Sequence, residues 1–198
     1  MEQTADAVVI GGGIFGGSVA HFLTRLGFGR IVLLEKRCFA AVSTGHTGGA
    51  IRTAYSNPLT IRLAVRALEM FRDAGERLGG DCRFRQTGYL IMFNTESLGV
   101  NVEEIDGEEI TVRWPELSLE HDDVGGGIFE PDSGVADGTT TTLALISSAA
   151  KRGLSVHEGV GATGIRLEGD RVVGVETEQG PIDTPVVGSL RHVPLSFF

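Results

Sequence analysis

The sequence lacks the features that point to a membrane, a metal or an oxidising compartment. None of its apolar runs approaches the roughly 20 residues that are needed to cross a bilayer. It has no basic segment followed by an apolar stretch, which would mark a signal peptide. The two cysteines, Cys38 and Cys82, form no metal-binding or redox spacing. We therefore expect a cytoplasmic protein with no transmembrane segment and no metal site.

Positive charge is also scarce. The 198 residues carry a formal net charge of −9, and only two of the 17 basic residues are lysines. Because non-specific binding to nucleic acid needs clustered lysine and arginine, we expect no nucleic-acid partner. With 41% hydrophobic and 22% charged residues, the chain has the composition of an ordinary globular protein.

The most informative segment that is present lies near the N-terminus. An apolar run at residues 5–10 leads directly into glycines with the spacing G-x-G-x-x-G, and an amphipathic stretch follows. This order is typical of the strand–turn–helix unit that binds a dinucleotide pyrophosphate. Its glycines permit a tight turn, a close approach of the phosphates to the backbone, and close packing of the helix on the sheet. The predicted contacts with the cofactor are Gly11, Gly12, Gly13, Ile14, Phe15 and Gly16.

A second buried strand is predicted at residues 31–34, and Glu35 ends it. A carboxylate at this place accepts hydrogen bonds from the ribose hydroxyls of adenosine. Because the same charge disfavours a 2′-phosphate, NADP is not the expected cofactor. The alternative interpretation is a glycine turn in an ordinary α/β domain that binds nothing.

The remaining elements are predicted from periodicity and from turn residues. Apolar residues at helical spacing predict helices at residues 18–26, 58–78 and 139–152. Shorter apolar or alternating runs predict strands at 84–93, 126–129, 154–158, 162–167 and 171–177, the last two as a hairpin. Residues 94–120 are polar and give no clear assignment.

Three further segments are distinctive: STGHTGGAIRTAYSNP at 43–58, FRQTGYL at 84–90, and EPDSGVAD at 130–137. Together with the N-terminal segment they resemble the D-amino-acid oxidase family of FAD-dependent oxidoreductases. This family includes sarcosine oxidases, dimethylglycine dehydrogenases and glycine oxidases. In these proteins the first segment passes beside the flavin, the second enters the substrate domain, and the third returns to the FAD-binding domain.

The resemblance implies an α/β fold, in which a Rossmann-like FAD-binding domain is joined to part of a second, α+β substrate domain. Residues 1–80 and 131–187 would form the FAD-binding domain, and residues 81–130 the partial substrate domain. Family members are longer, and residues 188–198 do not match the small-residue turn that the family has there. We therefore expect an incomplete C-terminal half with an atypical tail at 188–198.

The resemblance also implies further contacts with FAD. Hydroxyl or backbone N–H groups of Ser43 and Thr44 would reach the pyrophosphate, with ordinary helix capping as the alternative. Lys36 and Gly48 belong to the same set. His46 matches a histidine that carries FAD covalently in the dimethylglycine dehydrogenase branch, whereas other branches have arginine and non-covalent FAD. We expect non-covalent flavin here.

Arg52 matches an arginine that holds an amino-acid carboxylate near the flavin in this family. A planar fork of N–H donors suits that task, and a surface or ion-paired arginine is the alternative. Tyr55 would act beside Arg52 in catalysis, and Tyr89 would line the same pocket.

The expected function is FAD-dependent oxidation of an amine or amino acid, such as an N-methylated glycine or a D-amino acid, by hydride transfer to flavin. One alternative is a truncated, non-catalytic FAD-binding remnant. Another is an FAD-dependent dehydrogenase of a 2-hydroxy acid or glycerol phosphate. An NAD-dependent dehydrogenase is disfavoured because it has no need of residues 43–52. A homo-oligomer or an electron-acceptor protein remains open as a partner.

Overall fold

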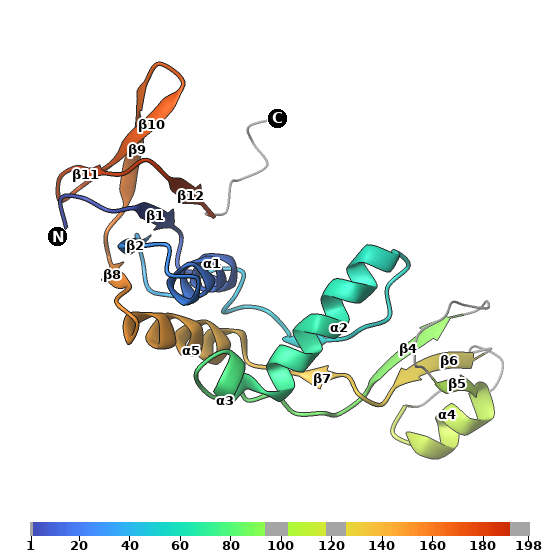
Figure 1. The fold of residues 1–198 in the computed structure, drawn as a ribbon. Helices are drawn as coiled ribbons and strands as arrows, with labels where there is room; N and C mark the ends of the chain where they lie inside the picture. The colour runs from blue at the N-terminus through green and yellow to red at the C-terminus, as the bar shows by residue number, and fades with distance from the viewer. Residues whose placement is uncertain (1, 94–102, 118–125, 191–198) are drawn as a thin grey trace. The chain divides into compact units, whose positions relative to one another are not determined.

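The computed structural model describes residues 2–93, 103–117 and 126–190 (Figure 1). They form two compact units, each built from separate stretches of the chain. The first unit contains Met1–Thr47, Ala74–Cys82 and Asp137–Phe198, and the second contains Gly48–Asp73 and Arg83–Ala136. The division predicted from the sequence differs at residues 48–73 and 131–136, which it placed with the FAD-binding part, and at residues 81–82, which it placed with the substrate part. Residues 191–198 of the predicted tail lie outside the described residues.

A four-stranded parallel sheet forms the centre of the first unit. Its strands are β1 (Ala7–Ile10), β2 (Ile31–Glu35), β8 (Ser155–Glu158) and β12 (Val187–Ser189), in the order β12-β1-β2-β8. All four residues of β1 and the first four of β2 are buried. Continuous apolar runs are typical of parallel strands that are covered on both faces.

Two helices cover one face of this sheet, α1 (Ile14–Arg25) and α5 (Gly138–Ala150) (Figure 1). Ala20 of α1 and Ala149 of α5 lie in one apolar cluster with Val9, Ile31 and Leu33 of the sheet. Small residues let the two helices lie close to the strands and to each other. Asp137 caps α5 by accepting a hydrogen bond from the Thr140 N–H at 2.6 Å.

A small antiparallel sheet covers the other face. It consists of β9 (Ala162–Glu168), β10 (Arg171–Thr177) and β11 (Ile182–Asp183). Val175 and Ile182 pack against the side chains on this face of the parallel sheet, which are Val8, Ile10, Val32 and Leu34. The hairpin predicted around residues 168–170 is confirmed. The parallel sheet with helices confirms the predicted α/β class.

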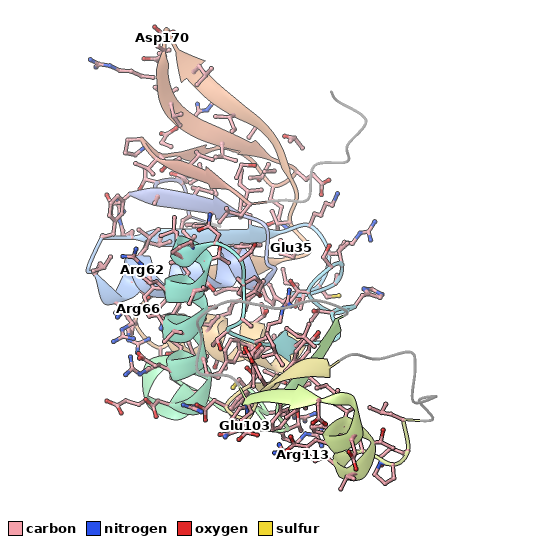
Figure 2. The ribbon with its side chains drawn as sticks, turned by 90° about the vertical axis from the view of Figure 1, so that its right-hand side faces the viewer. Glu35, Arg62, Arg66, Glu103, Arg113 and Asp170 are labelled. Atoms are coloured by element: carbon pink, nitrogen blue, oxygen red, sulfur yellow. The ribbon has the colours of Figure 1, made fainter. Side chains whose placement is uncertain are left out.

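The second unit holds two small sheets and a long helix. One sheet joins β4 (Tyr89–Phe93), β6 (Gly126–Glu130) and β5 (Glu103–Asp106), and the other pairs β3 (Ala50–Ile51) with β7 (Gly134–Val135). The long helix is α2 (Pro58–Arg72). A short helix, α4 (Gly107–Arg113), is tied to β5 because Arg113 pairs with Glu103 at 2.7 Å (Figure 2).

Two predicted boundaries are wrong. The helix predicted at 58–78 ends at Arg72, because Asp73 leaves the helical conformation, and a separate turn, α3 (Ala74–Arg77), follows in the first unit. The apolar spacing continues across this break, so periodicity could not reveal it. The strand predicted from residue 84 begins only at Tyr89, because Gly88 has a φ of +73° and bends the chain.

In the part of the chain that the structure describes, no helix is long and apolar enough to cross a membrane. The same residues contain no group of three or more His, Cys, Asp or Glu side chains that could hold a metal ion.

His21 of α1 is fully buried between α1 and α5, where its Nδ1 lies 3.3 Å from the Leu145 carbonyl oxygen. Burial lowers the pKa of His21, and the positive charges of Arg152 and Arg25 lower it further, although the contact with Leu145 opposes them. The unfolded chain therefore binds a proton at His21 more readily than the folded protein does.

We expect stability to fall as the pH drops below about 6.5, the ordinary histidine pKa, because protonation favours the unfolded chain. Urea unfolding of wild-type protein and His21→Leu between pH 8 and pH 5 measures this effect. His21→Leu should lose part of the pH dependence. The exposed His46 provides a control, because His46→Gln should retain it. Equal pH dependence in wild type and His21→Leu would contradict the assignment.

Candidate dinucleotide-binding site

The fold requires glycine at two positions of the turn between β1 and α1. Gly11 has a φ of +110°, which favours glycine, and its N–H donates to the Leu34 carbonyl oxygen at 2.8 Å. A Cβ on Gly16 would lie 1.7 Å from the carbonyl oxygen of Gly11. No side chain fits there, so α1 can approach the turn only with glycine at residue 16.

Gly13 is different, because the backbone alone does not require a glycine there. Its φ of −83° and ψ of −174° are extended values that other residues adopt. An added Cβ would have one near neighbour, Thr44 Oγ1 at 3.1 Å. Gly13 is the N-cap of α1 and offers no side-chain cap to the free N–H groups of the first turn. The missing side chain lets an anion approach the backbone at the start of α1, where the Thr44 hydroxyl already accepts from the Ile14 N–H.

The Glu35 carboxylate lies at the C-terminal end of β2 and contacts this turn (Figure 2). Its Oε2 accepts a hydrogen bond from the Gly12 N–H at 2.7 Å, and its Oε1 accepts one from the Arg37 N–H at 2.8 Å. Each carboxylate oxygen retains acceptor capacity for a ribose hydroxyl. Glu35 therefore also fixes the glycine turn, a second role that the sequence did not predict.

Thr44 reaches the start of α1 from a distant part of the chain. Its Oγ1 accepts a hydrogen bond from the Ile14 N–H at 3.1 Å. Both interpretations of Thr44 apply to this geometry, since the hydroxyl caps the helix at the very end where an anion would bind. Ser43, Phe15 and Lys36 are exposed to solvent.

His46 is exposed, and its Nδ1 lies 2.7 Å from the Val42 carbonyl oxygen. Because a carbonyl oxygen can only accept, this contact assigns the proton to Nδ1 in the neutral ring and leaves Nε2 without one. Gly48 begins the second unit and is exposed.

The predicted catalytic residues lie together in the second unit. The Arg52 guanidinium carbon is 4.6 Å from the centre of the Tyr55 ring and 5.8 Å from that of Tyr89. Arg52 is half-buried and has no ion-pair partner among the described residues. Cation–π contacts hold the side chain without neutralising its charge. The alternative of an ion-paired arginine is thus not supported.

Two acidic residues near these sites were missed by the sequence analysis. Glu158 of β8 accepts a hydrogen bond from the Phe39 N–H at 2.8 Å and so supports the loop after β2. Glu130, at the end of β6, is buried and accepts hydrogen bonds from Thr53 and Ser133. Glu130 opens the distinctive segment at 130–137, which was the only available indication of its importance.

A parallel sheet, a glycine turn and an open helix N-terminus define the first unit as a Rossmann-like dinucleotide-binding fold. The chain matches the family model "DAO: FAD dependent oxidoreductase" over residues 6–188. It therefore belongs to this family of FAD-dependent oxidoreductases, and the resemblance inferred from the sequence is confirmed, with FAD as the cofactor of the family.

Similar proteins of known name include two from mouse. The chain is 30% identical to mitochondrial sarcosine dehydrogenase of Mus musculus, with 94% of this chain and 22% of that protein covered. It is 26% identical to the mitochondrial pyruvate dehydrogenase phosphatase regulatory subunit of Mus musculus, with 92% and 22% covered. The chain thus spans about a fifth of the length of these relatives.

Among solved structures, L-proline dehydrogenase from P. horikoshii is similar over most of this chain. The TM-score is 0.86 at 28% sequence identity, and the match covers 97% of this chain and 54% of that one. This similarity confirms the predicted fold class.

Proposed function

We propose that this chain is the FAD-binding part of an oxidoreductase that acts on an amino acid or another amine. One observation carries the proposal: residue 13 is glycine although its backbone conformation does not require glycine. A side chain at this position would lie beside the N-terminus of α1, and we call this open backbone the cradle at Gly13. A group that must approach this backbone closely accounts for the glycine, and a pyrophosphate is such a group.

FAD fits the residues that surround this cradle. The N–H groups at the start of α1 suit the pyrophosphate, and the Glu35 carboxylate suits the adenosine ribose. Thr44 would contact the same anion, and Ser43, Lys36 and His46 of the first unit complete the proposed set, with His46 in non-covalent contact; the role of Gly48 stays a prediction. Bound FAD would supply the redox chemistry as a hydride acceptor, and the residues of the chain would bind and orient the cofactor and the amine.

In the second unit, we assign Arg52 to the carboxylate of the substrate. Its guanidinium has no anionic partner in the described residues, and the Tyr55 ring fixes one of its faces. Two similar proteins are named for sarcosine and L-proline. Both compounds are secondary amino acids with a free carboxylate. These names favour an amino acid of this class over a 2-hydroxy acid or glycerol phosphate.

Arg52→Lys tests this assignment. A lysine cannot form the two parallel hydrogen bonds of a guanidinium, so we expect sarcosine binding to weaken roughly tenfold to hundredfold, for a loss of about 1.5–3 kcal/mol. Titration of the FAD-loaded chain with sarcosine measures it, while FAD affinity should stay unchanged. Arg62→Lys, on the exposed side of α2, is the matched control (Figure 2). Equal sarcosine affinity in wild type and Arg52→Lys would exclude this role.

A second candidate is a non-catalytic FAD-binding protein. It is supported by the similarity to a protein that is named as a regulatory subunit. Anaerobic mixing of the FAD-loaded chain with sarcosine, L-proline, glycine and several D-amino acids separates the two candidates. Bleaching of the flavin absorbance by one of them would support the oxidoreductase. Tight FAD binding without bleaching by any of these compounds would support the non-catalytic protein.

The predicted cytoplasmic location stays a prediction.

A further inference from the structure

Glu130 is a buried carboxylate, and its donors among the described residues are all neutral. It is 1% exposed, and its Oε2 accepts hydrogen bonds from the Thr53 N–H at 2.6 Å and from the Thr53 and Ser133 hydroxyls at 2.7 Å. Within the described residues, its Oε1 has no hydrogen-bond partner and no cation pairs with it. Burying a charge without a counter-ion costs free energy of folding, so the position of Glu130 requires an explanation.

The hydrogen bonds keep this group ionised. Burial by itself raises the pKa of Glu130, but the hydrogen bonds donated by Thr53 and Ser133, together with the nearby backbone N–H of Ala54, outweigh it and lower the pKa below its usual value. Glu130 is therefore ionised near neutral pH, and its Oε2 acts as a hydrogen-bond acceptor for the Thr53 N–H and for the Thr53 and Ser133 hydroxyls.

These hydrogen bonds join the segments that surround Arg52. Thr53 directly follows Arg52, and Ser133 lies in the turn that leads from β6 into β7. Tyr89 of β4 stands opposite Glu130 in the strand pairing, and its ring is one of the two that contact the Arg52 guanidinium. The carboxylate thus anchors the backbone beside Arg52 to the strand that pairs with Tyr89.

We infer that Glu130 is a positioning residue, whose carboxylate fixes Thr53 and thereby holds the Arg52 guanidinium against Tyr55 and Tyr89, ready to receive a substrate carboxylate. The inference rests on the proposed function for the role of Arg52. Arginine has several rotatable bonds, and anchoring the next residue restricts the direction in which the side chain leaves the backbone. Because Glu130 accepts hydrogen bonds from neutral donors and does not pair with Arg52, the guanidinium remains available to pair with the carboxylate of a ligand.

Two substitutions distinguish this role from a merely structural one. Thr53→Val and Ser133→Ala each remove one hydroxyl that donates to the same oxygen at the same distance of 2.7 Å. A structural role predicts similar effects of both. The positioning role predicts that Thr53→Val disturbs Arg52 and that Ser133→Ala does not, because only Thr53 adjoins Arg52. The comparison remains valid if Glu130→Ala does not fold.

The first measurement needs no substrate. In protein with ¹⁵N-labelled arginine, the Arg52 Nε–H resonance, identified by its loss in Arg52→Lys, reports the neighbouring aromatic rings. Glu130→Ala and Thr53→Val should move this resonance toward the position of an exposed arginine, and Glu130→Asp should restore part of the shift. Ser133→Ala should leave it unchanged. An unchanged resonance in both Glu130→Ala and Thr53→Val would overturn the inference, whatever the ligand data show.

The second measurement is the affinity of the FAD-loaded chain for sarcosine and for sarcosinamide, which lacks the carboxylate. Thr53→Val should weaken sarcosine binding about fivefold or more and leave sarcosinamide binding unchanged, while Ser133→Ala changes neither. Equal weakening by both variants would overturn the inference in favour of a structural role. If wild-type protein binds neither compound, the proposed function fails, and the resonance of Arg52 still decides the role of Glu130.

Discussion

Gly13→Ala is expected to lower the affinity for FAD roughly tenfold to hundredfold while the protein still folds. The backbone at Gly13 has an extended conformation that alanine adopts, and the added methyl group would lie 3.1 Å from Thr44 Oγ1, a tight contact that a small movement of this hydroxyl relieves. The same methyl group would keep a pyrophosphate from the N–H groups of α1. Losing one hydrogen bond to a charged group costs about 1.5–3 kcal/mol. FAD titration and urea unfolding measure the two effects separately.

Two neighbouring glycines are controls for this result. Gly17→Ala adds a methyl group 3.4 Å from Ile146, in ordinary contact, and should stabilise α1 by up to about 1 kcal/mol without changing FAD affinity. Gly16→Ala places its Cβ 1.7 Å from the Gly11 carbonyl oxygen and should disrupt the fold itself. If Gly13→Ala binds FAD as well as Gly17→Ala does, the pyrophosphate does not lie at this turn.

Glu35→Arg should weaken FAD binding by roughly 1–3 kcal/mol, because it removes a charged acceptor and introduces an unmatched cation. The same change should improve binding of 2′,5′-ADP, whose 2′-phosphate the new guanidinium would pair with. Calorimetric titration of wild type and variant with FAD and with 2′,5′-ADP measures both. Weaker binding of both compounds would mean that the variant acts only through a damaged glycine turn.

This ambiguity arises because Glu35 also accepts the Gly12 N–H at 2.7 Å. Glu35→Gln combined with 2′-deoxy-ADP separates the two roles. If Glu35 contacts the ribose, losing the 2′-hydroxyl should cost wild-type protein more than it costs Glu35→Gln. Equal costs in both proteins would assign Glu35 to the glycine turn alone.

The first unit was predictable because its determinants are local in the sequence. Residues 5–16 carry the strand, the turn and the helix start in order, and Glu35 follows at the end of the next buried strand. Parallel strands that are covered on both faces appear as apolar runs, so β1 and β2 could be recognised without any knowledge of the fold.

Features that depend on distant contacts were not predictable. The break at Asp73 interrupts no apolar period, and it separates two helices that belong to different units. Glu130 binds Thr53, 77 positions away in the chain, and no local pattern marks that pair. Residues 103–113 gave no clear assignment, yet they form β5 and α4, where Asp106 caps the helix.

The central claim is that the first unit binds FAD in preference to nicotinamide dinucleotides. Calorimetric titration of the purified chain with FAD, NAD and NADP under identical conditions tests it most directly. The family match over residues 6–188 and the segment at 43–52 predict saturable binding of FAD with the lowest Kd of the three, and the Glu35 carboxylate predicts the weakest binding of NADP. Tighter binding of NAD than of FAD, or no binding of FAD at all, would contradict the account.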